Sequence, residues 1–256
     1  MIIIIKKRLI VFVLACVLAT LVFTLSTATP QPAGELRILR TVPADKAEGV
    51  PLYPQIRILT DRPVDWAAIR LEETGRGKLI PGKMQVSSQG ILFLPEEVFL
   101  PDTRYRVTVR AASSENVTPP LQFVFTTRSM ENQVWVDAKL GRIHTVTVYR
   151  GKFPLKHMLA SGGKPGQDTP YGMYRTKDRG SSFWSERFGE GATYWVRLHG
   201  QYLVHSVPKD ANWQTKEEEH AKLGLPASHG CVRLSDADAR WFYQNVPPGA
   251  TVIIHP

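Results

Sequence analysis

The stretch from Ala227 to Leu234, ASHGCVRL, places a thiol, an imidazole and a guanidinium close together near the C-terminal end of the chain. The chain contains two cysteines, and the other one, Cys16, lies in an apolar leader, so Cys231 has no partner in the rest of the protein. In an oxidising compartment an unpaired thiol either joins another molecule or is reactive. The chemistry that this stretch offers is nucleophilic attack by the sulfur of Cys231.

A thiol is mostly protonated at neutral pH, and a nearby imidazole activates it as a general base or as the partner of a thiolate. The candidate imidazoles are those of His199, His205 and His229. His229 and Cys231 are two residues apart, so in extended backbone their side chains share a face. Gly230 lies between them, where the backbone can approach another group closely. Arg233 continues the same face, and its guanidinium suits a carboxylate.

Two other interpretations of Cys231 stay open on residue types alone. A zinc ion could be held by His205, His229 and Cys231, with His199 as a further ligand, although this spacing matches none of the recurrent zinc patterns. Cys231 could also be an inert core residue, which its polar, glycine-containing surroundings disfavour.

The segment that carries these residues is expected to consist mostly of β-strands. After a boundary at 129–131, strand patterns recur in four short runs, 134–137, 145–149, 173–176 and 194–198. The glycine-rich stretch 160–169 lacks the Gly-Lys-Ser/Thr of a phosphate-binding loop and is expected to border a groove.

One helix is predicted directly after the reactive stretch. Ser235 is its expected capping residue, and the helix runs from Asp236 to about Asn245. Pro247-Pro248-Gly249 ends it, and residues 251–254 form a last strand.

The preceding segment, 36–128, predicts a β-sandwich. Short alternating or apolar runs at 55–60, 91–94, 105–110 and 121–126 are separated by prolines and turn residues. The segment has no histidine and no cysteine. It is therefore expected to act as a spacer or a weak binding module.

The first 29 residues predict a signal peptide or a signal anchor, followed by a linker at 30–35. Lys6-Lys7-Arg8 precedes an apolar run from Leu9 to Leu25, and Ser26-Thr27-Ala28 offers a cleavage site. Three of the charges in the net +9 lie in this leader, which leaves +6 for the rest. A balance of this size is typical of an ordinary soluble surface, and its functional interpretation is attraction to an anionic polymer, here the cell wall or a membrane surface. No basic block interleaved with aromatic residues indicates nucleic-acid binding.

Longer stretches around Cys231 resemble a known family. The segments LGLPASHGCVRLSDADARWFY and VPPGATVIIHP are similar to the catalytic segment of the L,D-transpeptidases of the YkuD type, as are ASGGKPGQDTPYGMYRT and YLVHSVPKD upstream. This resemblance spans about 131–256. The segments VPADKAEGVPLYPQIRILTDRPVD, LPDTRYRVTV and FVFTT resemble bacterial Ig-like domains. The implied fold is mainly β, an Ig-like β-sandwich at 36–128 followed by a mostly-β catalytic domain with short helices at 129–256.

The resemblance implies a role for each residue that matches the motif. Cys231 corresponds to the nucleophile, His205 to the base, and Ser206 to the neighbour whose backbone carbonyl orients the imidazole. His229 and Gly230 shape the site and its oxyanion hole, in which the Cys231 N–H is a candidate donor. The gap of 22 residues between His205 and Ser228 is longer than is usual in the family.

That longer gap contains TKEEEHAK, which is expected to be a solvated helical face, and it leaves His199 as an alternative base. Arg233 matches the motif arginine and either contacts substrate or forms a structural salt bridge. Tyr171 and Trp184, together with Trp213, are candidates to line a groove for the substrate, although single aromatic residues more often pack.

The implied activity is acyl transfer on peptidoglycan stem peptides through a thioester of Cys231, without a cofactor and without a bound metal. Resolution by an amine gives a 3→3 cross-link, and resolution by water gives an L,D-carboxypeptidase. A zinc-dependent hydrolase and a non-catalytic wall-binding protein are the alternatives. The expected place is outside the cytoplasm, in the cell wall or on the outer face of the membrane, with membrane contact through the N-terminal segment if it is not cleaved.

Overall fold

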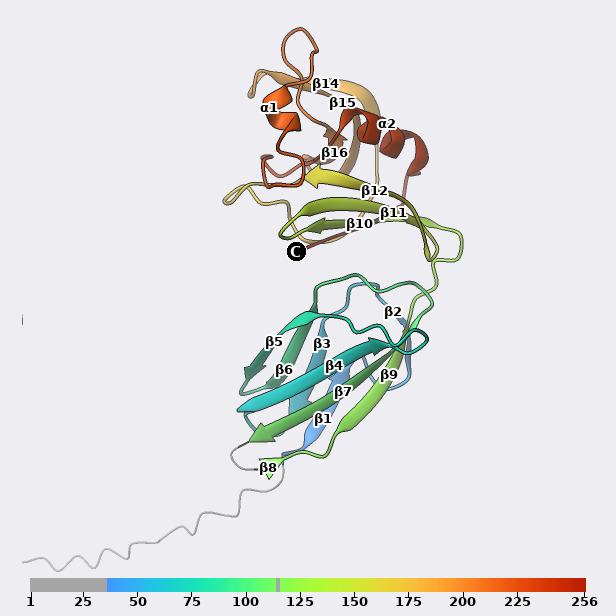
Figure 1. The fold of residues 1–256 in the computed structure, drawn as a ribbon, viewed down its shortest axis with the longest axis vertical. Coiled ribbons are helices and arrows are strands. Elements are labelled where there is room, and N and C mark those ends of the chain that lie inside the picture. The colour runs from blue at the N-terminus through green and yellow to red at the C-terminus, as the bar shows by residue number, and fades with distance from the viewer. Residues whose placement is uncertain (1–35, 114–115) are drawn as a thin grey trace, which may run out of the picture. The chain divides into compact units, whose positions relative to one another are not determined.

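The computed structural model describes residues 36–113 and 116–256 (Figure 1). The predicted leader at 1–29 and linker at 30–35 lie outside these residues. In the described part of the chain no helix is long and apolar enough to cross a membrane.

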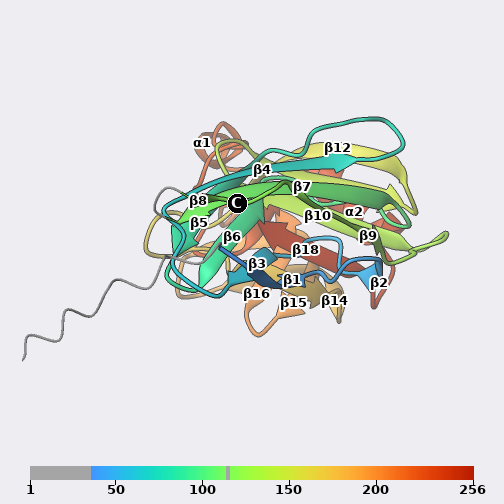
Figure 2. The ribbon, with the colours of Figure 1, turned by 90° about the horizontal axis from the view of Figure 1, so that it is seen from below.

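Residues 36–127 form a β-sandwich, as the sequence predicts. One sheet has the order β1–β3–β6–β5, made of β1 (Ile38–Val42), β3 (Ile56–Thr60), β6 (Gly90–Pro95) and β5 (Gly82–Ser87). The other has the order β2–β9–β7–β4, with β8 added to β7, and comprises β2 (Ala47–Val50), β9 (Leu121–Thr127), β7 (Arg104–Ser113), β4 (Trp66–Glu73) and β8 (Asn116–Val117). Strands β4, β7 and β9 run side by side in both views (Figure 1, Figure 2).

Alternation along each strand builds the core of this sandwich. In β7, Tyr105, Val107 and Val109 are buried, whereas Arg104 and Arg106, on either side of Tyr105, are exposed. Because successive side chains of a strand point to opposite faces, this pattern turns one face of β7 toward the opposite sheet. Burial of the alternating apolar residues is the main stabilisation that the sequence pattern predicts.

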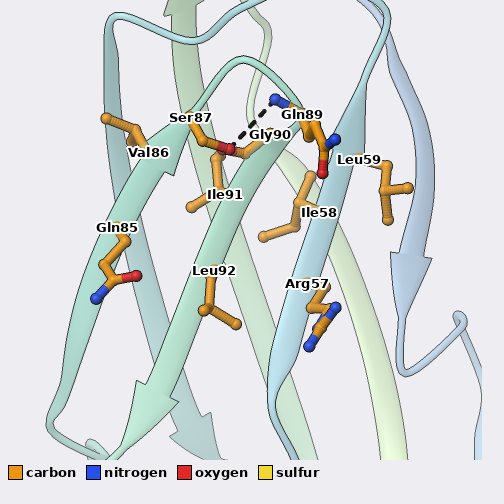
Figure 3. A pocket seen from close by; sticks show the side chains of 10 residues that line it. All are labelled: Arg57, Ile58, Leu59, Gln85, Val86, Ser87, Gln89, Gly90, Ile91 and Leu92. Carbon is orange, nitrogen blue, oxygen red and sulfur yellow. Dashed lines mark hydrogen bonds between the residues drawn. The ribbon is translucent and has the colours of Figure 1, made fainter.

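The sheet of β3, β5 and β6 carries a pocket of about 280 Å³, drawn in Figure 3. Its lining includes Ile58, Val86 and Leu92 with a single ionic side chain, Arg57. A Cβ at Gly90 would lie 2.0 Å from the carbonyl oxygen of Ile58, so only glycine allows β6 to pair this closely with β3. No nucleophile with a neighbouring base lines this pocket.

The C-terminal half is built on one nine-stranded sheet of order β13–β18–β10–β11–β12–β17–β16–β15–β14. The strands are β13 (Gly172–Arg175), β18 (Thr251–His255), β10 (Val134–Leu140), β11 (His144–Arg150), β12 (Phe153–Ser161), β17 (Val232–Leu234), β16 (Tyr202–Ser206), β15 (Glu190–His199) and β14 (Arg179–Ser185). Only the β10–β18 and β16–β17 pairs are parallel. The mainly-β fold class is confirmed, and β12 and β14 are strands that the periodicity missed.

Two helices complete this half of the chain, α1 (Glu217–His220) and α2 (Asp236–Asn245). The predicted cap of α2 is confirmed, because the side chain of Ser235 accepts a hydrogen bond of 3.1 Å from the N–H of Asp238. Ala239 and Phe242 are fully buried and join the core of the sheet. Helix α2 packs on β15, β16 and β17, and it thereby supports the strands that carry the reactive residues.

Candidate active site

Parallel pairing of β16 with β17 brings the reactive residues together. His205 lies opposite Arg233 in this ladder, and Val204 lies opposite Val232. Cys231 immediately precedes β17, so its side chain lies on the same face as that of Arg233. His205 and Cys231 are therefore diagonal neighbours across the pair, although 25 residues separate them in the chain.

These side chains line one pocket of about 180 Å³. His205, His229, Cys231 and Arg233 contribute to it, and Phe183 closes one wall with its ring edge-on to His205 at 5.5 Å. The structure thus brings together four of the residues that the sequence singled out. The inert-core interpretation of Cys231 does not fit this placement, because its side chain is partly exposed in the pocket.

Two backbone groups hold the thiol of Cys231. The N–H of Leu203 donates to Sγ at 3.4 Å, and the S–H can donate to the carbonyl of Gln201 at 3.5 Å. Burial raises the pKa of the Cys231 thiol, an effect that the Leu203 N–H and the charge of Arg233 partly offset. The resting side chain is therefore a neutral thiol, which would need a base to act as a nucleophile.

His205 is oriented as such a base. Its Nδ1 lies 2.6 Å from the carbonyl oxygen of Ser206, and because a carbonyl only accepts, Nδ1 carries the proton. Nε2 is then the basic nitrogen. Burial, with a smaller effect from Arg233, lowers the pKa of His205 to about 4, so the imidazole is neutral at physiological pH.

Ser206 is itself fixed between strands. Its hydroxyl accepts from the Thr193 N–H at 2.9 Å and donates to the Val207 carbonyl at 2.8 Å. The side chain therefore holds β16 against β15, while the carbonyl orients the imidazole. An imidazole held in one tautomer by a backbone carbonyl is pre-organised to accept a proton at its other nitrogen.

Ser228 lines the pocket and has a role that the sequence did not indicate. Its hydroxyl accepts from the Gly230 N–H at 3.0 Å and donates to the Cys231 carbonyl at 2.6 Å. Its backbone N–H donates to the Gly162 carbonyl at 2.9 Å. The loop before β17 is thus closed on itself and tied to the glycine-rich stretch, which positions Cys231. A serine three residues before the nucleophile was the only signal for this role.

His229 lines the pocket, and Gly230 connects it to Cys231. The ring of His229 is exposed and stacks on Phe188, with 4.4 Å between ring centres and an angle of 13°. Gly230 has φ of +117°, and a Cβ there would lie 2.6 Å from the ring of Tyr202. Only glycine fits this backbone conformation and this close approach.

Arg233 is buried, and both terminal nitrogens of its guanidinium meet carboxylates. Nη1 lies 2.6 Å from Glu219 and Nη2 lies 3.4 Å from Glu190. Glu219 belongs to α1, in the stretch that the sequence predicted to be a solvated face. Glu217 and Glu218 are indeed exposed, but Glu219 turns inward, so the prediction is wrong for that residue.

Four further candidates lie away from this pocket. His199 is exposed at the end of β15, where its ring centre lies 6.0 Å from that of Tyr174. Tyr171 lines a separate pocket with His144 and Thr169. Trp184 lies beside Trp213, with 6.0 Å between ring centres. None of these four residues lines the pocket of Cys231.

Thr169 has a structural role, since its hydroxyl accepts from the Gly163 N–H at 2.9 Å. Across residues 36–113 and 116–256, no group of three or more His, Cys, Asp or Glu side chains is arranged to hold a metal ion.

Comparison with known families gives two matches along the chain. Residues 131–254 match the family described as the L,D-transpeptidase catalytic domain, and residues 33–127 match the bacterial Ig-like domain. YciB of Bacillus subtilis, which is named as a candidate L,D-transpeptidase, is 37% identical over 129 residues, which is 48% of this chain and 66% of that protein. L,D-transpeptidase 1 of Mycobacterium tuberculosis is 34% identical over 131 residues, 44% of this chain and 49% of that protein.

The chain thus spans less than two thirds of the length of either relative. Among solved structures, an L,D-transpeptidase from Mycobacterium smegmatis is 20% identical with a TM-score of 0.42, covering 87% of this chain and 100% of that one. A likeness at this level supports no inference about function.

Proposed function

We propose that the protein is a cysteine-dependent L,D-transpeptidase that acts on peptidoglycan stem peptides, because residues 131–254 match the L,D-transpeptidase catalytic domain family. One observation carries the proposal. The imidazole of His205, with Nδ1–H bonded to the Ser206 carbonyl at 2.6 Å, lines the same pocket as the only cysteine among the described residues.

The first half of the reaction forms a thioester. Nε2 of His205 takes the proton of the Cys231 thiol as the sulfur attacks the carbonyl of the third, diamino-acid residue of a tetrapeptide stem. The tetrahedral oxyanion then collapses, the bond to the terminal D-alanine breaks, and the imidazolium returns the proton to the leaving amine. The neutral state of both groups at rest fits this order, because one proton passes from sulfur to nitrogen and on to the product.

The oxyanion needs donors that are already in place. The backbone N–H of Cys231 is the candidate, in a loop fixed by the side chain of Ser228. A missing oxyanion donor costs about 3 kcal/mol of transition-state stabilisation in enzymes of this kind. The conformation at Gly230 sets the direction of that N–H, which is a reason for glycine at this position.

The second half of the reaction resolves the thioester. An amine of a second stem gives a 3→3 cross-link, and water gives an L,D-carboxypeptidase product. Both start from the same acyl-enzyme, so the nature of the acceptor decides the name of the activity. We propose the amine as acceptor, with water as the competing one.

The substrate places the enzyme outside the cytoplasm, in the wall or on the outer face of the membrane. The net charge of +9, of which three charges lie in the predicted leader, is compatible with contact to an anionic wall polymer. The Ig-like domain is proposed as the spacer or wall-contacting part of the chain.

The test is incubation of the purified protein with tetrapeptide muropeptides, measuring D-alanine release and dimer formation separately. Both products are expected from the wild type, neither from Cys231→Ser, and both from the matched control Cys16→Ser. Dimer-free D-alanine release would indicate the carboxypeptidase. Activity that is lost with a chelator but survives alkylation would support the zinc hydrolase, and binding without turnover would support a wall-binding protein; either result overturns the proposal.

A further inference from the structure

Arg233 lies at the centre of a row of alternating charges. Its side chain is 6% exposed, and it pairs with Glu219 at 2.6 Å and with Glu190 at 3.4 Å. The second oxygen of Glu219 contacts Lys222 at 2.6 Å, and the second oxygen of Glu190 contacts Lys216 at 3.2 Å. Every carboxylate oxygen of the row therefore faces one cation.

Three members of this row come from one short segment, 216–222, which includes α1. Helix α1 buries none of its own residues. A one-turn helix without a buried face gains little from apolar packing, so its place depends on polar contacts. The inward side chain of Glu219 is the contact that joins α1 to the reactive site.

The backbone on both sides of α1 is anchored. The N–H of Lys216 donates to the Pro208 carbonyl at 3.0 Å, and the hydroxyl of Ser161 donates to the Lys222 carbonyl at 2.8 Å. The N–H of Gly224 donates to the Ala160 carbonyl at 2.7 Å. These bonds tie the segment to β12 and to the end of β16, so the carboxylate of Glu219 is presented to Arg233 from a fixed support.

Arg233 acts on the reacting pair through its position. It lies opposite His205 in the β16–β17 ladder, and its charge lowers the pKa of both His205 and Cys231. The other charged or titratable groups around the pocket include Arg197 with its partner Asp178, Glu190 and His229, with Lys164 and Arg187 beside His229. Glu190 neutralises part of the Arg233 charge from β15, and Glu219 does so from α1 at the shorter distance.

We propose that Glu219 is a positioning residue of the active site, which fixes the Arg233 guanidinium beside His205 and limits the positive charge that the Cys231–His205 pair experiences. The proposal rests on the proposed function only in taking Cys231 and His205 as the reacting pair. It makes the stretch between His205 and Ser228 part of the site rather than a solvated connection.

The experiment measures the pH dependence of Cys231 alkylation by iodoacetamide in the full chain carrying Cys16→Ser. In Glu219→Gln the charge of Arg233 is less compensated, which favours the thiolate. The apparent thiol pKa is therefore expected to fall by about half a unit, or about threefold more thiolate at a fixed pH below the pKa. Alkylation reports on the sulfur whether or not stem peptides are substrates, so failure of the proposed function stays distinguishable.

Glu218→Gln is the matched control, because it makes the same change of charge at an exposed position one residue earlier in α1. Its profile is expected to coincide with that of the wild type. Equal shifts in Glu218→Gln and Glu219→Gln, or no shift in Glu219→Gln, would overturn the proposal. If Glu219→Gln does not fold, Glu219→Asp replaces it, and a smaller fall of the thiol pKa is expected. An alkylation profile identical to that of the wild type would then contradict the proposal.

A second comparison tests whether Glu219 acts through Arg233. In a chain with Arg233→Gln, adding Glu219→Gln is expected to leave the thiol pKa unshifted or to shift it by much less. A full shift in that background would mean that Glu219 acts directly on the pair, which contradicts a positioning role.

Discussion

Gly230→Ala should separate two costs that the structure predicts at the residue before the nucleophile. Gly230 has φ of +117°, and an added Cβ would lie 2.6 Å from the ring of Tyr202. The first feature makes any L-residue strained, and the second forces either the Tyr202 ring or the loop to move. Because Cys231 follows directly, a moving loop would displace the sulfur from His205.

The magnitude follows from these two terms. A non-glycine residue held in such a conformation costs about 1–3 kcal/mol. Relieving the clash with the Tyr202 ring adds about 1–2 kcal/mol, in the range of overpacked sites. The two terms together cost about 2–5 kcal/mol, and at roughly 2–4 °C per kcal/mol for a chain of this size the melting temperature of the C-terminal domain should fall by about 4–20 °C.

Gly166→Ala is the matched control, since Gly166 has φ of +82° with nothing within 4 Å of the added Cβ. It carries the backbone cost without the clash. Thermal unfolding should therefore show a smaller loss for Gly166→Ala, with normal alkylation of Cys231, whereas Gly230→Ala loses both stability and D-alanine release. If Gly230→Ala were no less stable than Gly166→Ala and kept full activity, the argument from close approach would be refuted.

Three more predictions concern the reacting groups and their support. Because the pKa of His205 is lowered to about 4, kcat/KM should hold steady as pH falls from neutral and drop only near pH 4. The free energy of unfolding should decrease progressively below about pH 6.5, since an unfolded histidine binds a proton there that the folded one does not. A drop in kcat/KM centred near pH 6.5 would contradict this prediction. Ser228→Ala removes two hydrogen bonds of the loop and should cost about 1–3 kcal/mol in urea unfolding together with a lower kcat, and unchanged values would show that the loop does not need them. A carbapenem should add its mass to Cys231 in intact-protein mass spectrometry; an adduct that persists in Cys231→Ser would place the reactive group elsewhere.

The sequence predicted those parts of the structure that depend on local pattern. The alternation in β7 and the cap and length of α2 are properties of neighbouring residues, and the structure confirms both. The strand β12 was missed because the first part of it, around Phe153 to Leu155, is exposed on both faces and shows no alternation of polarity. Periodicity reports burial on one face, and a strand exposed in this way carries no such signal.

The environment of Arg233 could not be predicted in the same way. Three consecutive glutamates, 217–219, look alike in sequence, and only the turn of α1 selects Glu219 to face inward. Its partner lies 14 residues further along the chain, and Glu190 lies 43 residues before Arg233. The identity of an ion pair at such separations is set by the tertiary fold, so the sequence left open whether the guanidinium binds substrate or carboxylates of the protein.

The side-by-side hydrogen bonding of β16 and β17 also has a practical consequence. The relative placement of sulfur and imidazole is dictated by the ladder itself, so the chain that leaves after Val207 has to keep only the contacts of the segment 216–222 on its way back to Ala227. The exposed residues 211–212 precede that segment, and extra residues inserted there would cost little loop entropy while both ends of the loop keep their register. An engineer seeking to add a new recognition element to this half of the protein would find the insertion point at 211–212.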